Sequence, residues 1–390
     1  MILSGKIPRI LLTLCFSFFV LFTPHDPSHA GEINIRVAIY RAIARCTIAV
    51  NGAFKITDPV SATVLLEGDR LWLSELFREN DSFRLGKKHL LRGNRILVEP
   101  RRNGTLAVNG KYYRGSVTII REGNNFSVVN TIDLEQYVSG VLYHEISDQW
   151  PLEAIKAQAV AVRSYAIYSM QKSGARDYDL TGDSYSQVYG GRDAERYRTS
   201  LAVRKTRGEI LVYQNKVLPA FFHANSGGIT ENAAELWDIN IPPLRGGVKS
   251  VYSLNLPSYK WDRNFRLKDI QEKLAVKGYQ TGLIKEIKVI ERNSTGRVRK
   301  LSIEDRTGKL ITIDGKTFRE AIGPNLIRSS LFTVTMKGWY VDISGKGWGH
   351  GVGLCQWGAY GMAKQGHNYR SILIFYYPSS ELKTTVEMNL

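Results

Sequence analysis

The feature that most constrains the fold is a series of short apolar runs from about residue 33 to residue 120. Turn residues separate these runs, which are rich in β-branched side chains and fall at residues 35–39, 63–66, 95–98 and 116–120. β-branched residues favour strands, whereas Gly, Asn and Asp favour turns. Asn109-Gly110 is typical of a two-residue hairpin. We therefore expect a mainly antiparallel β domain in this part of the chain.

The segment from Pro151 to Gly174 carries the strongest helix signal. Apolar residues recur there at spacings of three and four, which predicts one buried stripe: Leu152, Ile155, Ala159, Val162, Ala166 and Met170. Pro151 suits the first helical turn, and Ser147 or Asp148 can cap it. Gly174 suits the far end. A helix is thus expected to follow the β domain.

Two cations lie on another face of this predicted helix. Lys156 and Arg163 are seven residues apart, which places them about 20° from each other around the helix. Glu145 comes just before the helix, so the three residues form a candidate site. The alternative is an exposed face on which both cations are solvated.

The rest of the chain predicts further mixed structure. Strand-like runs cover residues 209–213 and 218–222, and a Gly-rich tail runs from 345 to 366. Between them we expect an inserted lobe with helices over 267–276 and 316–322 and strands over 284–292 and 298–304. The predicted fold class is α+β. Its parts are a signal peptide (1–30), a β-rich domain (31–122), a core in two parts (123–257 and 331–390) and the inserted α+β lobe (258–330).

The N-terminal segment is typical of a secretory signal. Lys6 and Arg9 precede an apolar run over residues 10–22, and residues 28–30 read Ser-His-Ala, a small-x-small cleavage pattern. Cleavage would leave a mature chain that begins near Gly31. The apolar run is too short for the ~20 residues that span a bilayer. We expect an exported protein in the periplasm or cell wall, with membrane contact only through an uncleaved signal segment.

Charge and cysteine content narrow the class of partner. The net charge of +17 suits an anionic polymer, and export makes nucleic acid an unsuitable target. Only Cys46 and Cys355 follow the signal segment, too few for a disulfide scaffold. They either pair with each other or lie apart as small buried residues.

Three motifs carry the candidate chemistry. The first, residues 141–165, contains Glu145, Lys156 and Arg163; the second, 222–231, begins Phe-His-Ala-Asn-Ser; the third, 347–363, begins Gly-Trp-Gly-His. In order and spacing they resemble the signature segments of the SpoIID/LytB family, named after the stage II sporulation protein D and the amidase enhancer LytB. The resemblance covers nearly the whole chain after the signal segment.

The resemblance implies a function and a set of residues. The sporulation members of the family are lytic transglycosylases, which cleave the bond between N-acetylmuramic acid and N-acetylglucosamine and leave 1,6-anhydro ends. Glu145 stands at the place of their catalytic acid, and Lys156 and Arg163 match cations that matter in the family. Further residues are expected to shape the substrate cleft: His223, Ser226, His350 and Gln356. The alternative is a non-catalytic, glycan-binding enhancer of a cell-wall amidase.

A single carboxyl group suffices for the transglycosylase reaction. A partly buried Glu keeps its proton near neutral pH, donates it to the glycosidic oxygen and then accepts one from the C6 hydroxyl. A hydrolase ordinarily needs a second carboxylate. Asp133, Glu135 and Asp148 are near in sequence, although Asp148 also suits a helix cap.

No metal or organic cofactor is expected. His144-Glu145 begins like a zincin motif, but Asp148 stands where the second His belongs. Some relatives hold zinc in the segment that matches residues 184–189, which has neither Cys nor His here. Two alternatives remain open: a metal held by His223, His350 and Cys355, or Cys355 as a thiol nucleophile. Aromatic residues that could stack on sugars are Tyr165, Trp348, Trp357 and Tyr360.

Overall fold

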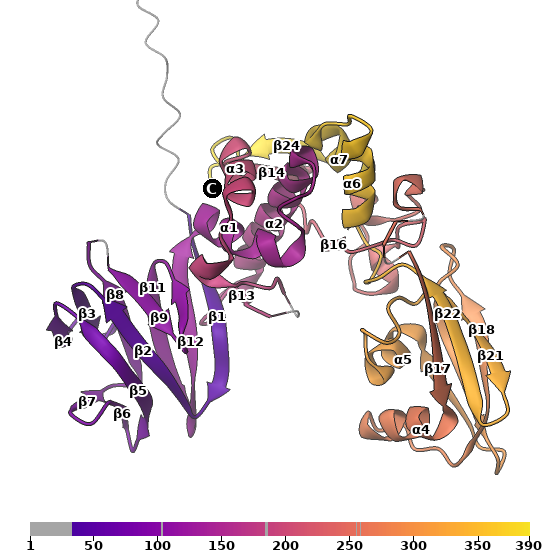
Figure 1. The fold of residues 1–390 in the computed structure, drawn as a ribbon, viewed down its shortest axis with the longest axis horizontal. Helices are drawn as coiled ribbons and strands as arrows, with labels where there is room; N and C mark the ends of the chain where they lie inside the picture. Colours follow the sequence, from indigo (N-terminus) through magenta and orange to yellow (C-terminus); the bar gives the residue numbers. More distant parts are fainter. Residues whose placement is uncertain (1–32, 103, 184–185, 255, 258) are drawn as a thin grey trace, which may run out of the picture. The chain divides into compact units, whose positions relative to one another are not determined.

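The computed structural model describes residues 33–390 except 103, 184–185, 255 and 258. The predicted signal segment and its cleavage site therefore lie outside the described residues. Within the described part of the chain, no helix is both long and apolar enough to cross a membrane. Figure 1 shows the ribbon with the helices and strands labelled.

Two sheets form the β-rich region (Figure 1). The first has the order β13-β1-β12-β11-β8-β3-β4, and the second has the order β10-β9-β2-β5-β6-β7. Burial alternates along β2, where Cys46, Ile48 and Val50 are buried and their neighbours are not. Buried residues of both sheets join one hydrophobic cluster, so the predicted β-rich region is confirmed. The strands are β1 (Asn34–Ile43), β2 (Arg45–Asn51), β3 (Phe54–Thr57), β4 (Val64–Gly68), β5 (Leu71–Glu79), β6 (Ser82–Leu85), β7 (His89–Arg92), β8 (Arg95–Pro100), β9 (Thr105–Val108), β10 (Lys111–Tyr113), β11 (Ser116–Glu122), β12 (Asn125–Asp133) and β13 (Leu180–Thr181).

The first sheet continues past residue 122. Strand β12 pairs in antiparallel register with both β1 and β11, and β13 adds a parallel edge to β1. The expected domain boundary at residue 122 thus falls at the turn between β11 and β12. The Asn109-Gly110 hairpin is confirmed: it joins β9 to β10, and both residues have positive φ, 49° and 77°.

Helix α2 (Leu152–Ser173) follows the predicted course, from Pro151 to the C-cap Gly174. The predicted caps are wrong: Pro151 holds the N-cap position without a side-chain hydrogen bond, and the Ser147 hydroxyl instead accepts from the Gln149 amide. The predicted apolar stripe packs into the core shared with the β sheets. Residues on other sides of α2 are buried in a second core: Ala154, Ala157, Val160 and Ala161. This helix is therefore covered nearly all round, by α1 (Leu134–Glu145) and α3 (Tyr197–Lys205) among others.

The second core includes elements from the end of the chain. Strands β14 (Glu209–Tyr213), β15 (Lys216–Val217) and β24 (Glu381–Thr384) form one small sheet. Strand β16 (Phe222–His223) pairs in parallel with β23 (Leu354–Cys355). The strand predicted over 218–222 is wrong except at Phe222, because β15 ends at Val217 and β16 begins at Phe222. Helices α6 (Gln356–Lys364) and α7 (Tyr369–Tyr376) pack against α2, and short 3-10 helices occupy Gly191–Ala194, Ala233–Glu235, Pro242–Leu244 and Val251–Ser253.

The inserted lobe contains the predicted elements. They are α4 (Leu267–Val276), β18 (Ile284–Arg292), β19 (Val298–Asp305) and α5 (Gly315–Ile322), joined by β20 (Leu310–Asp314). A second small sheet has the order β17-β22-β21, from β17 (Lys260–Arg266), β21 (Phe332–Lys337) and β22 (Tyr340–Lys346). Because β17 pairs with β22, the lobe extends beyond residue 330, where the sequence pattern suggested that it ends.

The two described cysteines are free and lie apart. Cys46 belongs to the cluster of the β sheets, and burial raises the pKa of its thiol to about 12. Cys355 belongs to the second core, where its sulfur accepts hydrogen bonds from the backbone N–H groups of Ser226 and Gly358. Of the two alternatives, the structure has the small buried residue and not the disulfide.

Candidate active site

A pocket of about 510 Å³ brings together the end of α1, the middle of α2, the lobe and the Gly-rich tail. Glu145 opens onto this pocket, and most of its other walls come from residues far away in sequence. The lining residues are Glu145, Tyr165, Ser186, Val188, Phe221, Phe222, Leu236, Trp237, Lys316, Arg319, Glu320, Ser330, Gly349 and His350.

Glu145 is the last residue of α1. The helix begins where the Asp133 side chain accepts hydrogen bonds from the backbone N–H groups of Glu135 and Gln136, so its length carries Glu145 to the pocket. The Val188 N–H donates to the Glu145 carboxylate over 3.2 Å, and the Gln356 side chain also donates to it. Burial outweighs these bonds and raises the pKa of Glu145. The negative end of the helix dipole acts in the same direction.

His350 lines the pocket, but its ring is held by backbone groups. Its Nδ1 accepts from the Val352 N–H over 3.0 Å, and the Phe222 carbonyl accepts from the ring. His223 lies behind it, with Nδ1 donating to the Val352 carbonyl at 3.0 Å. Burial lowers the pKa of His350 to about 3 and that of His223 well below its usual value. Burial thus favours the neutral form of both rings, and their hydrogen bonds to Val352 fix the Gly-rich tail.

The other two predicted cleft residues, Gln356 and Ser226, differ in whether they reach the pocket. Gln356 contacts the Glu145 carboxylate, as described above. Ser226 is fully buried and does not line the pocket: its N–H donates to the Cys355 sulfur at 3.3 Å, and its carbonyl accepts from Arg297 at 2.8 Å. Ser226 therefore holds the core together and does not line the cleft.

The expected cation pair is corrected by the structure. Arg163 is fully buried and makes a two-point ion pair with Glu135, at 2.8 and 2.7 Å, rather than facing Glu145. Lys156 binds Glu153 at 2.6 Å and lies over the ring of Tyr369. Strand β14 and helix α7, which come later in the chain, cover this face of α2. Neither cation lines the Glu145 pocket.

The carboxylates near Glu145 in sequence do not line the pocket either. Asp133 caps α1, Glu135 binds Arg163, and Asp148 accepts from the Gln149 side chain. The second carboxylate in the wall is instead Glu320, an exposed residue of α5. It enters from the lobe, which local sequence could not connect with Glu145.

The lobe also supplies the cations of the wall, Lys316 and Arg319. Both lie on α5, and Lys316 donates to the Leu236 carbonyl at 3.1 Å. Sequence reasoning missed them, since a helix was expected here but nothing in it indicated which side faces the core. The same applies to Trp237, which lines the pocket and stacks on Phe221 with ring centres 4.4 Å apart.

Of the four aromatic residues expected to stack on sugars, only Tyr165 lines the pocket. Trp357 and Tyr360 pack against Trp150, and Trp348 lies under Arg328. These three aromatic rings have partners within the protein and form part of its packing.

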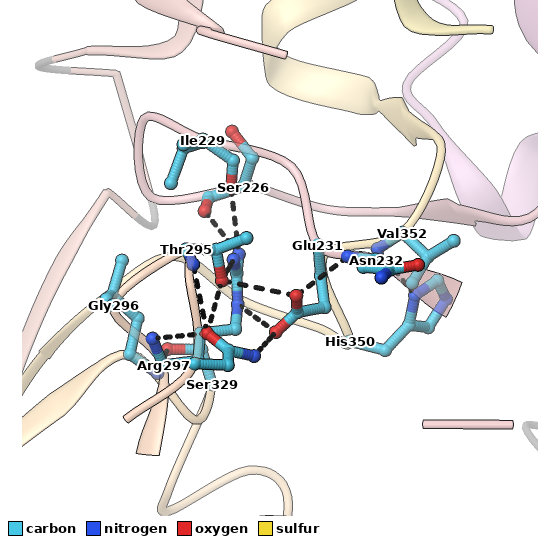
Figure 2. Close-up of polar contacts among 12 residues, drawn as sticks. Ser226, Ile229, Glu231, Asn232, Thr295, Gly296, Arg297, Ser329, His350 and Val352 are labelled. Carbon is cyan, nitrogen blue, oxygen red and sulfur yellow. Dashed lines mark hydrogen bonds and ion pairs between the residues drawn. The ribbon is translucent and has the colours of Figure 1, made fainter. Parts of the chain in front are cut away.

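A buried polar network fastens the lobe beside the pocket (Figure 2). Arg297 donates to the carbonyls of Ser226 and Ile229 at 2.8 and 3.0 Å and lies 3.8 Å from the Glu231 carboxylate. Glu231 in turn accepts from Asn293 at 2.7 Å. Gly351 must lack a side chain here, because a Cβ would lie 2.5 Å from the Arg297 guanidinium. The network ties the lobe to the two loops that carry His223 and His350.

A metal site at His223, His350 and Cys355 is the alternative that the sequence leaves open. Nowhere among them do three or more His, Cys, Asp or Glu side chains gather as metal ligands. His350 and Cys355 are engaged in the hydrogen bonds given above, and His223 is engaged through Nδ1, whereas its Nε2 is buried without a partner among the described residues. The Cys355 sulfur accepts two backbone N–H groups and is fully buried, a poor setting for a nucleophile.

Comparison with known proteins identifies the family of the chain. Residues 122–213, which include Glu145, match the family model described as Stage II sporulation protein. Over 282 residues the chain is 32% identical to the stage II sporulation protein D of Bacillus subtilis (strain 168), covering 68% of this chain and 78% of that protein. The chain belongs to the SpoIID/LytB family.

Two further relatives match larger shares of this chain. An uncharacterized protein of Brachyspira hyodysenteriae is 34% identical over 89% of this chain and 92% of its own length. An amidase enhancer of Bacillus subtilis (strain 168) is 29% identical, and the match spans about half of that protein, 47%. Residues 249–353 match a domain of unknown function, which coincides with the lobe and its continuation past residue 330. SpoIID/LytB membership gives the protein a cell-wall-related role.

Proposed function

We propose that this SpoIID/LytB protein is a lytic transglycosylase. It would cleave the bond between N-acetylmuramic acid and N-acetylglucosamine in peptidoglycan and leave 1,6-anhydro ends. The observation that carries the proposal is the Glu145 carboxyl group, whose pKa burial raises and which opens onto the pocket. Such a group keeps its proton closer to neutral pH than a solvated Glu does.

The chemistry requires Glu145 to act twice. As an acid it gives its proton to the glycosidic oxygen, while the bond from that oxygen to C1 breaks. As a carboxylate it then removes the proton of the C6 hydroxyl, whose oxygen bonds to C1 and closes the anhydro ring. The proton returns to Glu145, so atoms and charge balance without a cofactor. Val188 and Gln356, which both donate to this carboxylate, hold it in place and stabilise its charged form.

The setting of the reaction is part of the proposal. We propose that the protein acts outside the cytoplasmic membrane, in the periplasm or cell wall, as its N-terminal segment predicts. The net charge of +17 would favour an anionic glycan polymer through long-range attraction. Trp237 and Tyr165 offer aromatic surface for sugar rings inside the pocket.

A second function has support from one relative. The amidase enhancer of Bacillus subtilis is similar over 74% of this chain, so a glycan-binding protein that stimulates a cell-wall amidase is the competing proposal. In that case the pocket would hold glycan without cutting it. Glu145 would then contribute to binding only.

Mass spectrometry of digested peptidoglycan tests the two proposals. Purified protein without residues 1–30 is incubated with cell-wall sacculi, and the released fragments are analysed. We expect 1,6-anhydro-muramic ends that are absent from the untreated control. Reducing ends would instead indicate a hydrolase, with Glu320 as the second carboxylate to examine. An absence of new ends, together with stimulation of an added amidase, would favour the enhancer.

A further inference from the structure

Helix α5 has a fixed orientation in the lobe. Phe318 and Ile322 are fully buried in the core of the lobe, at four-residue spacing. Gly315 lets the start of the helix approach β19, because a Cβ there would lie 2.1 Å from the Val298 carbonyl oxygen. With these contacts in place, the neighbouring Arg319 lines the pocket together with Lys316.

Arg319 is a largely buried cation without a partner. Within the described part of the chain, its guanidinium makes no ion pair, and its Nε is buried without a hydrogen-bond acceptor. Burial lowers its pKa, and among the described residues the charge that opposes this shift is Glu320. A buried charge normally requires a partner. An unsatisfied guanidinium in a pocket wall therefore points to a ligand that completes it.

Two other buried arginines show what Arg319 lacks. Arg163 has the Glu135 carboxylate at 2.7 Å, and Arg297 has Glu231 as well as two carbonyl oxygens. Both side chains are fully buried and both have protein partners, although the Nε of Arg297, like that of Arg319, makes no hydrogen bond to a described residue. Arg319 differs from them in that it faces a pocket.

The surroundings of Arg319 favour an anion over a neutral group. Lys316 adds a second cation to the same wall, and burial lowers the pKa of His350, another lining residue, to about 3. Glu145 in its acid form adds no negative charge. Glu320 is exposed, so water screens it more than it screens Arg319.

We propose that Arg319 is the specificity-determining residue of this pocket and binds a carboxylate of the glycan substrate through paired hydrogen bonds. The inference rests on the proposed glycan-binding function. An arginine fork matches a carboxylate in geometry, which a lysine does not. Peptidoglycan offers this chemistry in two places: the lactyl group of a muramic acid without a stem peptide, and the carboxylates of a stem peptide.

Binding measurements in the Glu145→Gln background test the proposal without turnover. Three probes are compared by calorimetry: peptide-free glycan oligomers with a free lactyl carboxylate, oligomers that carry stem peptides, and neutral N-acetylglucosamine oligomers. Arg319→Met should weaken binding of one carboxylate-bearing probe by about 10-fold to 100-fold, the size of a charge-assisted hydrogen bond. Binding of the neutral oligomer should not change. The probe that loses affinity identifies the source of the carboxylate.

Two control variants separate recognition from general effects. Arg306→Met removes a positive charge from the same lobe, where Arg306 lies over Trp339 and outside the pocket, and it should leave all three affinities unchanged. Arg319→Lys keeps the positive charge but cannot make two parallel hydrogen bonds to a carboxylate. Its affinity for the carboxylate-bearing probe should therefore lie between those of Arg319→Met and the unsubstituted Arg319 protein. Arg319→Met should not lower the melting temperature, because it removes a buried charge that has no partner.

Two results would overturn the proposal: unchanged affinity for both carboxylate-bearing probes, or an equal loss for charged and neutral probes. Failure of the Arg319 proposal can be distinguished from failure of the transglycosylase proposal. A protein that yields no anhydro ends but loses affinity for a carboxylate-bearing probe on Arg319→Met would refute the transglycosylase and support Arg319. A protein that binds no glycan at all would refute both.

Discussion

The two ends of helix α1 carry glutamates in opposite situations. At the first turn, Glu135 receives both donors of Arg163 and the Gly208 N–H at 3.0 Å, so its carboxylate is well satisfied by protein groups. At the last residue, Glu145 has two donors and no cation within ion-pair distance among the described residues. Burial without a counter-charge raises the pKa of Glu145, whereas the same residue type at the other end of the helix stabilises the fold.

The difference shows why residue type and sequence spacing are poor guides to a site. Arg163 resembles an ideal substrate ligand by its place on α2, but its hydrogen-bonding capacity is used inside the protein. The side chains that face the pocket with unused capacity come from the lobe. A buried charge with a partner is part of the structure, and one without a partner is a candidate for function.

The largest effect is expected for Glu145→Gln. Glutamine keeps the shape of the protonated acid but cannot transfer a proton, so formation of anhydro ends should fall by about 100-fold to 10,000-fold. Muropeptide analysis measures this loss, and the melting temperature serves as a check of folding. Undiminished product formation by the variant would show that another group is the acid.

Glu135→Gln should lower the stability of the protein and leave its activity unchanged, the reverse of Glu145→Gln. It strands the Arg163 guanidinium in the interior and should lower the free energy of unfolding by about 3 to 5 kcal/mol. Urea unfolding measures this change. At a temperature where the variant is folded, its specific activity should remain close to that of the wild type. A variant that is stable but inactive would bring Glu135 into the reaction.

Arg163→Lys should have a smaller effect on stability. Lysine retains the charge but cannot make the paired bonds to Glu135 and the bond to the Glu209 carbonyl at 2.9 Å. We expect a loss of about 1 to 3 kcal/mol in urea unfolding. Lys172→Arg, at the exposed end of the same helix, is the control and should change nothing. Loss of activity at unchanged stability would instead return Arg163 to the site.

The pH dependence of stability tests the buried state of Glu145. Because its pKa is raised in the folded protein, Glu145 contributes stability that is fully present below the unfolded pKa of about 4.3. That contribution is lost as the pH rises through the higher folded pKa. Glu145→Gln removes the titration, so the variant should gain stability relative to the wild type as the pH rises above about 4. A difference that does not vary with pH would contradict the raised pKa.

The smallest effect is expected from a chelator. The described residues offer no cluster of metal ligands, and the proposed reaction needs none. Excess EDTA should leave product formation unchanged. Activity that disappears with EDTA and returns specifically with zinc would require a site that His223, His350 and Cys355 do not form in this structure.

Much of the fold follows from local patterns. The β-branched runs predict strands at 35–39, 63–66, 95–98 and 116–120, where β1, β4, β8 and β11 lie, and the three- and four-residue spacing predicts α2. Each of these patterns depends on neighbours along the chain. Glu145 was found through its motif. The pocket wall was not, since Arg319 and Trp237 reach it through contacts between distant segments. The assignment of Lys156 and Arg163 to the Glu145 site is wrong for the same reason. Strand β14 and helix α7 cover the face of α2 that carries them, and the sequence of α2 alone does not show this.

The parallel pairing of β16 with β23 has a consequence for the newly made chain. Phe222 pairs with Leu354, so the two strands meet only after the whole lobe between them has been synthesised. Glu145 and its helix emerge long before that point, when His350 and Gln356 are still missing. A chain that stops early, or that is still emerging, thus has Glu145 and its donor Val188 but lacks Gln356, the second donor, and His350 of the pocket wall. Under the proposed function, the protein would stay inactive until its synthesis is nearly complete.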